Sequence, residues 1–282
     1  MTARDAERPI RLGVLGDPLA FTRSPALHRA GLEALGLHGE SSAIRTAPAS
    51  LGARLADLAA RGFRGVNLTA PLKEAALAHL DSVSAAAREA RSVNTVCFDP
   101  GATRGETTDG PGALDLLREL KRDPARERAV ILGAGGAARS LALALCAAGA
   151  EHVAATSRRP DDVHAAWREM PQVELLQWRS AEEDARLARA TLVINATPLG
   201  APGAAGPAQE PAALEPLPRP AAVLDLVYGE RVTPWVERAR ALGHPAWDGL
   251  GLLVHQARRS LAIWLGREVP LEPLARAVGW PR

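Results

Sequence analysis

Short apolar runs alternate with longer segments of helical spacing along the chain. In its first part, strand-like runs lie at residues 10–16, 41–47 and 65–69, and helix-like segments lie at residues 25–37, 50–62 and 71–80. Such alternation is typical of βαβ units, whose strands form a mostly parallel sheet with helices on its faces. The pattern therefore predicts an α/β fold for this part of the chain.

A second series of the same kind begins at residue 128. It contains a strand followed by a helix in residues 128–150, further strand-like runs at 152–158, 191–200 and 221–227, and two final helix-like segments at 251–265 and 271–280. At 282 residues the chain is long enough that two cores are more usual than one. We therefore expect two α/β domains, joined near residues 109–112.

Composition and charge narrow the class of protein. The formal net charge is +2, with acidic and basic residues interspersed and no basic stripe of the kind that binds phosphate backbones. The first ten residues are charged and polar, which argues against a signal peptide, and the longest uncharged run is broken by prolines and glycines. Cys97 and Cys146 form no CxxC pair, which fits a reducing compartment. We expect a cytoplasmic protein that binds a small molecule and neither nucleic acid nor membrane.

A glycine-rich stretch, AVILGAGGAARSLALAL, follows a strand-like run and opens a helix-like segment. Gly133, Gly135 and Ala138 stand at G-x-G-x-x-A spacing. In this context the glycines permit a tight turn and close approach of the backbone, and the helix N-terminus faces a pyrophosphate. The stretch predicts a dinucleotide site, with a merely structural turn as the alternative. The contacts expected from the loop are Gly133, Ala134, Gly135, Gly136 and Ala137.

The end of the next strand indicates which dinucleotide is bound. An NAD site places an acidic residue there to hold the ribose hydroxyls, but this chain has Ser157, Arg158 and Arg159. A hydroxyl and two guanidinium groups suit a 2′-phosphate, so the pattern favours NADP. The alternative is an ordinary exposed basic turn, whose charge Asp161 and Asp162 partly cancel.

The chain contains only three asparagines, and each lies beside a strand-like run. Asn67 and Thr69 share one face at the end of their strand, and Asn94 presents its amide from another strand. Ligands of open α/β sheets bind beyond the carboxyl ends of the strands, so these groups are expected to converge there. Asn195 lies in INATPLG, together with Thr197. The alternative for each is a local role in satisfying backbone groups at a turn.

Lysine is rarer still, because only Lys73 and Lys121 are present and the other 32 of the 34 basic residues are arginine. Pro71 suits the start of a helix over residues 71–80, and in that helix Lys73 shares a face with Leu77 and Leu80. A lysine on an apolar face either extends its ammonium to solvent or lines a cleft. Because lysine is scarce and a polar strand end lies beside it, the second interpretation stands equally beside the first.

Seven motifs occur in the order found in shikimate dehydrogenases, which the chain resembles over nearly its whole length. They are GDPLAFTRSPALH, NLTAPLKE, SVNTV, GETTDGPG, GAGGAAR, NATPLG and DGLGLLVHQA. The resemblance implies an N-terminal substrate domain with a mostly parallel sheet and a Rossmann-like NADP domain, with C-terminal helices that return to the first domain. The expected boundaries are 1–111, 112–248 and 249–282. It further implies reversible reduction of 3-dehydroshikimate to shikimate by NADPH, in a monomer or homodimer.

Residue by residue, the resemblance implies that Lys73 is the general acid and base and that Asp109 is its partner. The alternative for Asp109 is an N-cap of a helix over residues 111–120. The substrate contacts implied are Thr22, Ser24, Asn67, Thr69, Asn94, Gln256 and Tyr228. The cofactor contacts implied beyond the glycine loop are Ser157, Arg158, Arg159, Asn195, Thr197 and Gly249. No metal site is expected, because the seven histidines show no paired-ligand spacing.

The chain departs from the family pattern at several positions. Thr22 stands in place of a serine, Thr107 in place of an asparagine, and Ser157, Arg158 and Arg159 in place of Asn-Arg-Thr. The extra methyl group of Thr22 bears on selectivity between shikimate and quinate. Two alternatives therefore stand beside an NADP-dependent shikimate dehydrogenase: a quinate/shikimate dehydrogenase using NAD or either cofactor, and a dinucleotide-binding sensor without catalysis. The sensor needs neither Lys73 nor Asp109.

Overall fold

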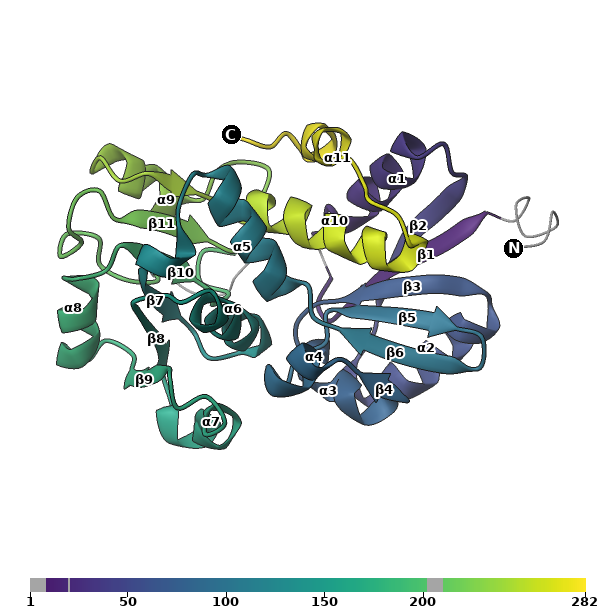
Figure 1. Ribbon diagram of the computed structural model, residues 1–282, viewed down its shortest axis with the longest axis horizontal. Helices are drawn as coiled ribbons and strands as arrows, with labels where there is room; N and C mark the ends of the chain where they lie inside the picture. The colour runs from purple at the N-terminus through teal and green to yellow at the C-terminus, as the bar shows by residue number, and fades with distance from the viewer. Residues whose placement is uncertain (1–8, 20, 202–209) are drawn as a thin grey trace. The chain divides into compact units, whose positions relative to one another are not determined.

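The computed structural model describes residues 9–19, 21–201 and 210–282 (Figure 1). The chain divides into two units. The first unit comprises the residues up to Gly112 together with Leu253–Pro281, and the second comprises Ala113–Leu252 with Arg282. Each unit contains a six-stranded sheet covered by helices, so the predicted α/β class is confirmed.

The first unit is built on the sheet order β2-β1-β3-β5-β6-β4. Its strands are β1 (Ile10–Gly16), β2 (Gly39–Arg45), β3 (Phe63–Leu68), β4 (Ser82–Val83), β5 (Thr95–Asp99) and β6 (Ala102–Glu106). Strand β1 pairs in parallel with β2 and β3, and β4 pairs in parallel with β6. Strand β5 runs antiparallel to both β3 and β6, forming a hairpin with β6 that the βαβ pattern does not predict.

The helices predicted at residues 25–37 and 50–62 are confirmed, and shorter helical segments that the pattern does not predict accompany them. The full set is α1 (Ser24–Ala34), η1 (Pro48–Ser50), α2 (Leu51–Ala60), α3 (Leu72–Ala75), η2 (Ala76–His79) and α4 (Ala85–Glu89). Helix α2 shows why they pack, because Leu51, Leu55 and Leu58 form one apolar stripe that is buried in the core of the unit. The core also takes the inward side chains of β1, β3 and β5.

One predicted helix differs in detail. In place of a single helix over residues 71–80, the chain forms one turn of α-helix followed by one turn of 3-10 helix. The buried side chains are those of Leu72 and Ala76, while Lys73, Leu77 and Leu80 are only partly buried. The change of helix type shifts the side-chain spacing from 3.6 residues per turn toward three, so Leu72 and Ala76 lie within the core while Leu77 and Leu80 pack against it.

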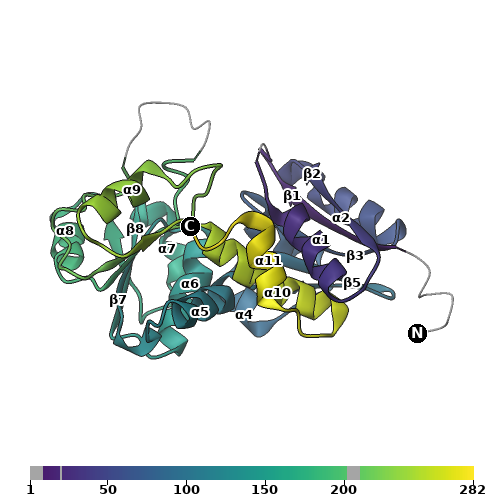
Figure 2. The same ribbon diagram turned by 90° about the horizontal axis from the view of Figure 1, so that it is seen from above.

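Two C-terminal helices complete the first unit, as the final pattern predicts. They are α10 (Leu250–Leu265), which begins in the second unit, and α11 (Leu271–Val278). Figures 1 and 2 show α11 lying beside α1. Helix α10 reaches the sheet at Gly65 of β3, where a β-carbon would lie only 2.1 Å from Nε1 of Trp264. That indole nitrogen donates a hydrogen bond to the carbonyl of Val96 at 2.9 Å. Glycine is therefore required at position 65 for the helix to pack there.

The second unit has a fully parallel sheet of order β12-β11-β10-β7-β8-β9. Its strands are β7 (Arg128–Leu132), β8 (His152–Ser157), β9 (Glu174–Gln177), β10 (Leu192–Asn195), β11 (Ala222–Asp225) and β12 (Ala246–Trp247). Its helices are α5 (Asp109–Glu119), which begins in the first unit, η3 (Pro124–Arg126), α6 (Gly136–Ala147), α7 (Pro160–Trp167), α8 (Ala181–Leu187) and α9 (Pro234–Ala241). The strand order reverses between β7 and β10, which is the arrangement of a dinucleotide-binding sheet.

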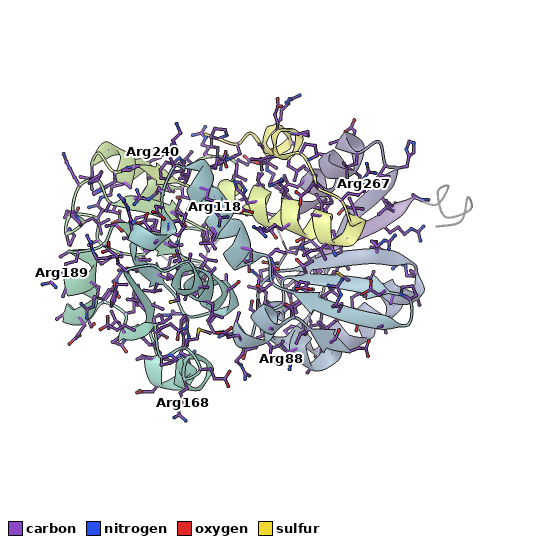
Figure 3. The ribbon with its side chains drawn as sticks, viewed as in Figure 1. Arg88, Arg118, Arg168, Arg189, Arg240 and Arg267 are labelled. Carbon is purple, nitrogen blue, oxygen red and sulfur yellow. The ribbon has the colours of Figure 1, made fainter. Side chains whose placement is uncertain are left out.

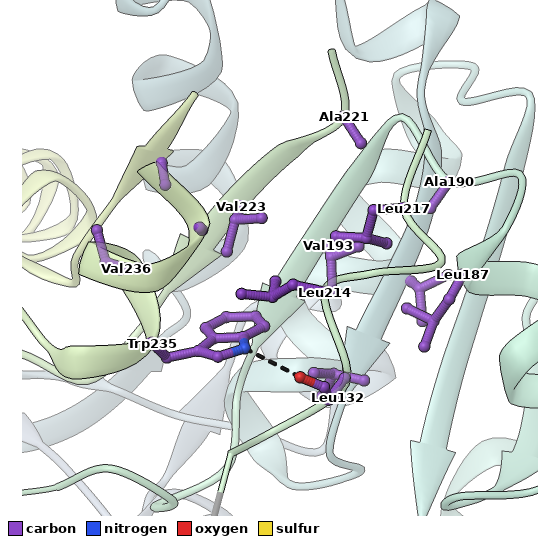
Figure 4. Packing of buried hydrophobic residues seen from close by; sticks show 14 residues of the cluster. Leu132, Leu187, Ala190, Val193, Leu214, Leu217, Ala221, Val223, Trp235 and Val236 are labelled. Carbon is purple, nitrogen blue, oxygen red and sulfur yellow. Dashed lines mark hydrogen bonds between the residues drawn. The ribbon is translucent and has the colours of Figure 1, made fainter. Parts of the chain in front are cut away.

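Figure 4 shows part of the core of this unit. Side chains of β7, β10 and β11 pack with Trp235 and Val236 of α9, all of them almost fully buried. The indole nitrogen of Trp235 donates to the carbonyl of Ala212 at 3.1 Å, so the only polar atom of this side chain is satisfied. The central strands are buried on both faces, as in other parallel sheets.

The arginines that supply most of the positive charge lie at the surface. Six that are exposed and distributed over both units are Arg88, Arg118, Arg168, Arg189, Arg240 and Arg267 (Figure 3). Acidic side chains are interspersed among the arginines and pair with many of them. Among the described residues, no helix combines the length and the hydropathy that crossing a bilayer requires.

Candidate functional site

The first unit pairs Lys73 with Asp109. Lys73 lies in α3, and Asp109 is the first residue of α5. The ammonium Nζ lies 2.6 Å from Oδ2 of the carboxylate, and the side chains are 18% and 7% exposed. The lysine therefore does not simply extend to solvent from an apolar face, because its charge is directed at a buried carboxylate.

The alternative role of Asp109, an N-cap of a helix over residues 111–120, does not account for its contacts. Helix α5 already begins at Asp109, and the carbonyl of Thr108 accepts the hydrogen bond of Gly112 N–H at 2.8 Å. Both carboxylate oxygens face other elements, since Oδ1 accepts from Nδ2 of Asn94 at 2.8 Å while Oδ2 accepts from Lys73. The carboxylate is thus oriented by two donors from different parts of the chain.

Asn94 connects three elements at this point. Its Oδ1 accepts from the N–H of Thr108 at 2.7 Å, and its Nδ2 lies 3.3 Å from Oε1 of Gln256 on α10. Gln256 in turn donates from Nε2 to the carbonyl of Leu253 at 2.9 Å. Asn94 precedes β5, which runs antiparallel to β3, so the start of β5 lies at the carboxyl end of β3. The antiparallel hairpin therefore brings Asn94 next to Asn67.

A chain of buried hydrogen bonds extends from this cluster into the unit. Asn67 donates from Nδ2 to the carbonyl of Asn94 and to Oγ of Ser260, each at 2.9 Å. Ser260 lies on α10 and also contacts the hydroxyl of Thr95 at 2.7 Å. On the other side, Oδ1 of Asn67 bonds Nε2 of His28 at 2.9 Å. The amides are thus held in fixed orientations.

The sequence pattern does not predict that four further residues belong to the site: His28, Thr95, Thr108 and Ser260. The motifs GDPLAFTRSPALH and SVNTV contain His28 and Thr95, but nothing in their spacing indicates which side chains turn inward. The signal for Ser260 in the sequence is its spacing, because it stands four residues after Gln256 in an apolar helix-like segment.

His28 is fully buried between Ser41 and Asn67. Its Nδ1 bonds Oγ of Ser41 at 2.8 Å, and its ring meets the edge of Trp264 with centroids 5.2 Å apart. Burial lowers the pKa of His28 from 6.5 to about 4, against the opposing effect of the hydrogen bond with Asn67. The imidazole is therefore neutral near pH 7, with one ring nitrogen donating and the other accepting.

Thr22, Ser24 and Thr69 lie in the same unit, near the carboxyl ends of β1 and β3. Oγ1 of Thr22 accepts from the N–H of Ser24 at 3.2 Å, and Ser24 is buried at the start of α1. Thr69 follows β3, and its methyl group lies against Gly16 at the end of β1, where a β-carbon would approach it to 2.4 Å. Six of the seven predicted substrate contacts are in this unit, whereas Tyr228 belongs to the second unit.

The glycine loop of the second unit has the geometry that a dinucleotide requires. Gly133 has a φ of 113°, and a β-carbon there would lie 3.1 Å from both the carbonyl oxygen of Ala196 and a methyl group of Thr197. Gly135 caps α6 and has open space where its β-carbon would lie. These features leave an uncovered helix N-terminus beside the strand-order reversal, so the loop fits a bound diphosphate.

Strand β8 pairs with β7, and the N–H of Gly133 donates to the carbonyl of Thr156 at 3.0 Å, so Ser157, Arg158 and Arg159 follow a strand end beside this loop. Oγ of Ser157 accepts from the N–H of Arg159 at 3.1 Å. Nε of Arg159 lies 3.2 Å from Oδ2 of Asp162, and both side chains are largely exposed. For Arg158 the structure records no side-chain ion pair with any described residue. Asp162 therefore partly cancels the positive charge of Arg159, as expected for this turn, but not that of Arg158.

Asn195 is buried and shapes the loop that contacts Gly133. Its Oδ1 accepts from both the N–H and the hydroxyl of Thr197, and its Nδ2 donates to Oδ1 of Asp225 at 2.8 Å. Asp225 also accepts from the hydroxyl of Thr233 at 2.7 Å. Burial raises the pKa of Asp225 from 3.8 to about 6. This arrangement is the local role considered above for asparagine, and Asp225 and Thr233 were not among the predicted residues.

Tyr228 and Gly249 follow the carboxyl ends of β11 and β12, which are neighbouring parallel strands. Gly249 donates from its N–H to the carbonyl of Val227 at 3.0 Å, and a β-carbon would lie 2.2 Å from the carbonyl oxygen of Leu226. Glycine is therefore needed at position 249 for this close approach. Tyr228 follows directly after this segment and is partly buried.

Comparison with known proteins places these features in context. Residues 14–96 match the model of a shikimate dehydrogenase substrate binding domain, and residues 249–278 match that of a shikimate 5′-dehydrogenase C-terminal domain. The shikimate dehydrogenase (NADP(+)) of Acidiphilium cryptum is 43% identical over 257 residues, covering 90% of each chain.

Solved structures of similar proteins share the fold over nearly the whole chain. Shikimate 5-dehydrogenase from Thermus thermophilus, in complex with NADP(H) and shikimate, is 37% identical with a TM-score of 0.85, covering 96% of this chain and 98% of the other. The ligand-free 5-ketofructose reductase of a Gluconobacter species is 31% identical with a TM-score of 0.80, covering 97% and 99%. The second likeness shows that substrate identity depends on residues within a shared fold.

Proposed function

The chain belongs to the shikimate dehydrogenase family, and from this premise we infer that it catalyses the reversible reduction of 3-dehydroshikimate to shikimate with NADPH. The observation that carries the proposal is the ion pair between the partly buried Lys73 and the buried Asp109, since a protein that only bound the nucleotide would need neither residue. NADPH supplies the hydride, and the residues of this chain bind the substrate and move the proton.

We propose that Lys73 transfers the proton. In the direction of reduction its ammonium donates to the carbonyl oxygen of the substrate, and in oxidation the neutral amine accepts from the hydroxyl. Asp109, at 2.6 Å, orients the ammonium of the lysine, while Asn94 holds the carboxylate from the other side. The lysine side chain is 18% exposed, so it can recover its proton from water after each turnover.

The substrate is proposed to be held by hydroxyl and amide groups. Thr22 and Ser24 offer hydroxyls to the carboxylate, and the remaining contacts proposed are Asn67, Thr69, Asn94, Gln256 and Tyr228. Asn67 and Asn94 are almost fully buried, so they act with little freedom to reorient. A site whose polar groups are fixed discriminates strongly against a ligand that leaves them unpaired.

The cofactor is NADP. The glycine loop binds its diphosphate, with contacts proposed at Gly133, Ala134, Gly135, Gly136 and Ala137. The proposed contacts elsewhere are Ser157, Arg158 and Arg159 for the 2′-phosphate, with Thr197 and Gly249 beyond. Asn195 is proposed to act by holding Thr197 in place, because its own amide is occupied within the unit.

A second function is favoured by one observation. Arg159 is paired with Asp162, which weakens the positive field expected of an NADP site and keeps a quinate/shikimate dehydrogenase using NAD as the alternative. Turnover assays with shikimate and quinate, each with NADP and NAD, separate the two. We expect shikimate with NADP to give the highest kcat/KM. Equal or better turnover of quinate with NAD would establish the alternative, and no turnover of either acid would refute both.

Arg158 provides a specific test of cofactor choice. We expect Arg158→Ala to weaken NADP binding by roughly 10- to 100-fold and to leave NAD binding unchanged, because a charge-assisted hydrogen bond to the 2′-phosphate is lost. Direct titration with each nucleotide measures the effect. Arg168→Ala, which removes an exposed arginine of the same unit (Figure 3), is the matched control. Equal weakening of both nucleotides would contradict the assignment.

We also propose a cytoplasmic location and a monomer or homodimer. Both cysteines, Cys97 and Cys146, are free thiols, and burial raises the pKa of each, which makes them poorly reactive. Sedimentation of the purified protein measures the oligomeric state.

A further inference from the structure

The carbonyl group of Ala134, in the middle of the glycine loop, receives two side-chain donors. Nε1 of Trp167 lies 3.2 Å from this oxygen, and Nη1 of Arg139 lies 3.4 Å from it. Trp167 is the last residue of α7 and is only 4% exposed. The indole therefore reaches the loop from outside the strand and helix that form it.

This contact fixes the direction of one peptide group. The bond between Ala134 and Gly135 is trans and planar, so the N–H of Gly135 points opposite to the carbonyl of Ala134. With the carbonyl directed at Trp167 and Arg139, the N–H is directed away from them. Among the described residues, no acceptor pairs with this N–H, and the space beside Gly135 is open.

We propose that Trp167 is a positioning residue for NADP, which orients the Gly135 N–H toward the diphosphate through its hydrogen bond to the Ala134 carbonyl. The inference rests on the proposed function, since it requires that the loop bind a dinucleotide. Without the indole donor, the peptide group rotates more freely in the unbound protein. Ordering it on binding then makes the binding free energy of the nucleotide less favourable. Arg139 alone holds the carbonyl less well, because its contact is longer.

Helix α7 connects Trp167 to the residues proposed for the 2′-phosphate. It begins at Pro160, directly after Arg158 and Arg159, and ends at Trp167. One short helix therefore connects the residues proposed for the 2′-phosphate with the residue that holds the diphosphate loop. The two roles are separable, because NAD has the diphosphate but lacks the 2′-phosphate.

The test is Trp167→Phe, titrated with NADP and with NAD. Loss of one hydrogen bond should weaken both nucleotides by the same factor, roughly three- to tenfold, because both carry the diphosphate. The KM for shikimate and the kcat at saturating NADP should remain those of the unaltered protein. If Trp167 merely stabilised the unit, its substitution would lower the unfolding temperature without weakening the binding of either nucleotide.

The matched control is Trp235→Phe. Trp235 is equally buried in the same unit and likewise donates from Nε1 to a loop carbonyl, that of Ala212 (Figure 4). The Trp235→Phe change should lower the stability of the protein about as much as Trp167→Phe and leave the affinities for NADP and NAD unchanged. A second variant replaces Trp167 with the isosteric benzothienylalanine, whose sulfur removes the N–H while it keeps the ring volume, so that packing is preserved if phenylalanine is not tolerated.

The outcomes are distinct. Equal weakening of NADP and NAD in the Trp167 variants alone supports the inference. Unchanged affinities overturn it, and so does a loss confined to NADP, because Trp167 would then act through the 2′-phosphate contacts. Failure of the unaltered protein to bind either nucleotide would refute the proposed function itself, together with the inference that depends on it.

Discussion

The two lysines of the chain occupy contrasting surroundings. Lys73 directs its ammonium at the buried carboxylate of Asp109, whereas Lys121 is exposed at a turn with a φ of 57°. Arginine in place of either residue retains the positive charge but, with a pKa above about 12, does not exchange its proton near neutrality. The substitution therefore separates charge from proton transfer.

We predict that Lys73→Arg lowers kcat by ~10²-fold or more and leaves the Kd for NADP close to that of the unaltered protein. Steady-state kinetics and direct nucleotide titration measure the two quantities. Lys121→Arg is the control and should have no effect on either. A correctly folded Lys73→Arg protein with near-normal kcat would exclude proton transfer by this residue.

A second prediction concerns His28 and pH. The pKa of this buried imidazole is about 4 in the folded protein and 6.5 when it is unperturbed, so between these values the unfolded chain binds a proton that the folded one does not. Stability should therefore fall as the pH is lowered from about 6.5 toward 4, by on the order of 1.4 kcal/mol per pH unit from this group.

Denaturant unfolding at several pH values measures this slope. His28→Gln should be less stable at pH 7 but should show a flatter decline, and His38→Gln, at an exposed position, should retain the slope of the unaltered protein. An unchanged slope in His28→Gln would mean that other groups account for the acid sensitivity.

At the scale of single residues, the sequence indicates which side chains belong to the site better than it indicates what each side chain contacts. Scarcity and motif order drew attention to Lys73, Asp109 and Asn94, which the structure brings together. His28 and Ser260 escaped notice because their inward orientation depends on packing between distant segments, which spacing along one segment does not reveal. Asn195 carried the right motif, but its amide bonds within its own unit.

At the scale of elements, α10 is the part of the first unit that connects most of the buried polar groups. It contributes Gln256 next to Asn94 and Ser260 next to Asn67, and its Trp264 packs at Gly65. The position of the helix on the sheet and the orientation of the amides therefore depend on one another. Loss of the serine hydroxyl should affect both.

We predict that Ser260→Ala reduces the free energy of unfolding by ~1–3 kcal/mol, because buried partners of the hydroxyl lose a hydrogen bond. The KM for shikimate should rise as Asn67 becomes less fixed. Ser92→Ala is the control, because Ser92 is equally buried but its hydroxyl has no partner among the described residues. It should be neutral or slightly stabilising, and equal destabilisation by both changes would argue against a specific role of the Ser260 bonds.

The apolar pattern predicts most elements but not all pairings. It identified β1, β2, β3, α1 and α2 in the first unit, β7, α6, β8, β10 and β11 in the second, and α10 and α11, because their apolar runs or helical periods are long enough to recognise. It did not identify the short strands β4, β6, β9 and β12 or the helices α4, α7, α8 and α9. It missed the antiparallel β5–β6 hairpin, since the apolar content of a strand gives no sign of its direction. It also merged α3 and η2 into one helix, because a change from α to 3-10 spacing over four residues leaves the composition unaltered.

At the scale of the whole molecule, the chain passes from the first unit to the second and back, and the last residue of the sequence lies in the second unit. The guanidinium of Arg282 lies 2.9 Å from Oδ2 of Asp248 and donates to the carbonyls of Gly229, Glu230 and Arg231. The Asp248 side chain is fully buried. This contact secures the segment that carries Tyr228 and the one that carries Gly249.

We predict that Arg282→Met destabilises the protein by ~3–5 kcal/mol, because Asp248 becomes a buried carboxylate without its partner. The double change with Asp248→Asn should recover part of the loss, since the uncompensated charge is removed. Arg267→Met, at an exposed arginine of the first unit (Figure 3), should have little effect. Thermal and denaturant unfolding measure these differences, and a stability of Arg282→Met equal to that of Arg267→Met would show that solvent supports Asp248 instead.

The pairing of an ammonium with a buried carboxylate, in a chain with so few lysines, has a spectroscopic consequence. Selective isotopic labelling of lysine places a ¹⁵N nucleus at only two side chains in the entire protein, and their surroundings differ enough to separate the resonances. The signal from Lys73 then reports its protonation directly, in the unaltered protein, as substrate and nucleotide are added. Proton transfer can thus be followed by magnetic resonance at the reacting atom itself.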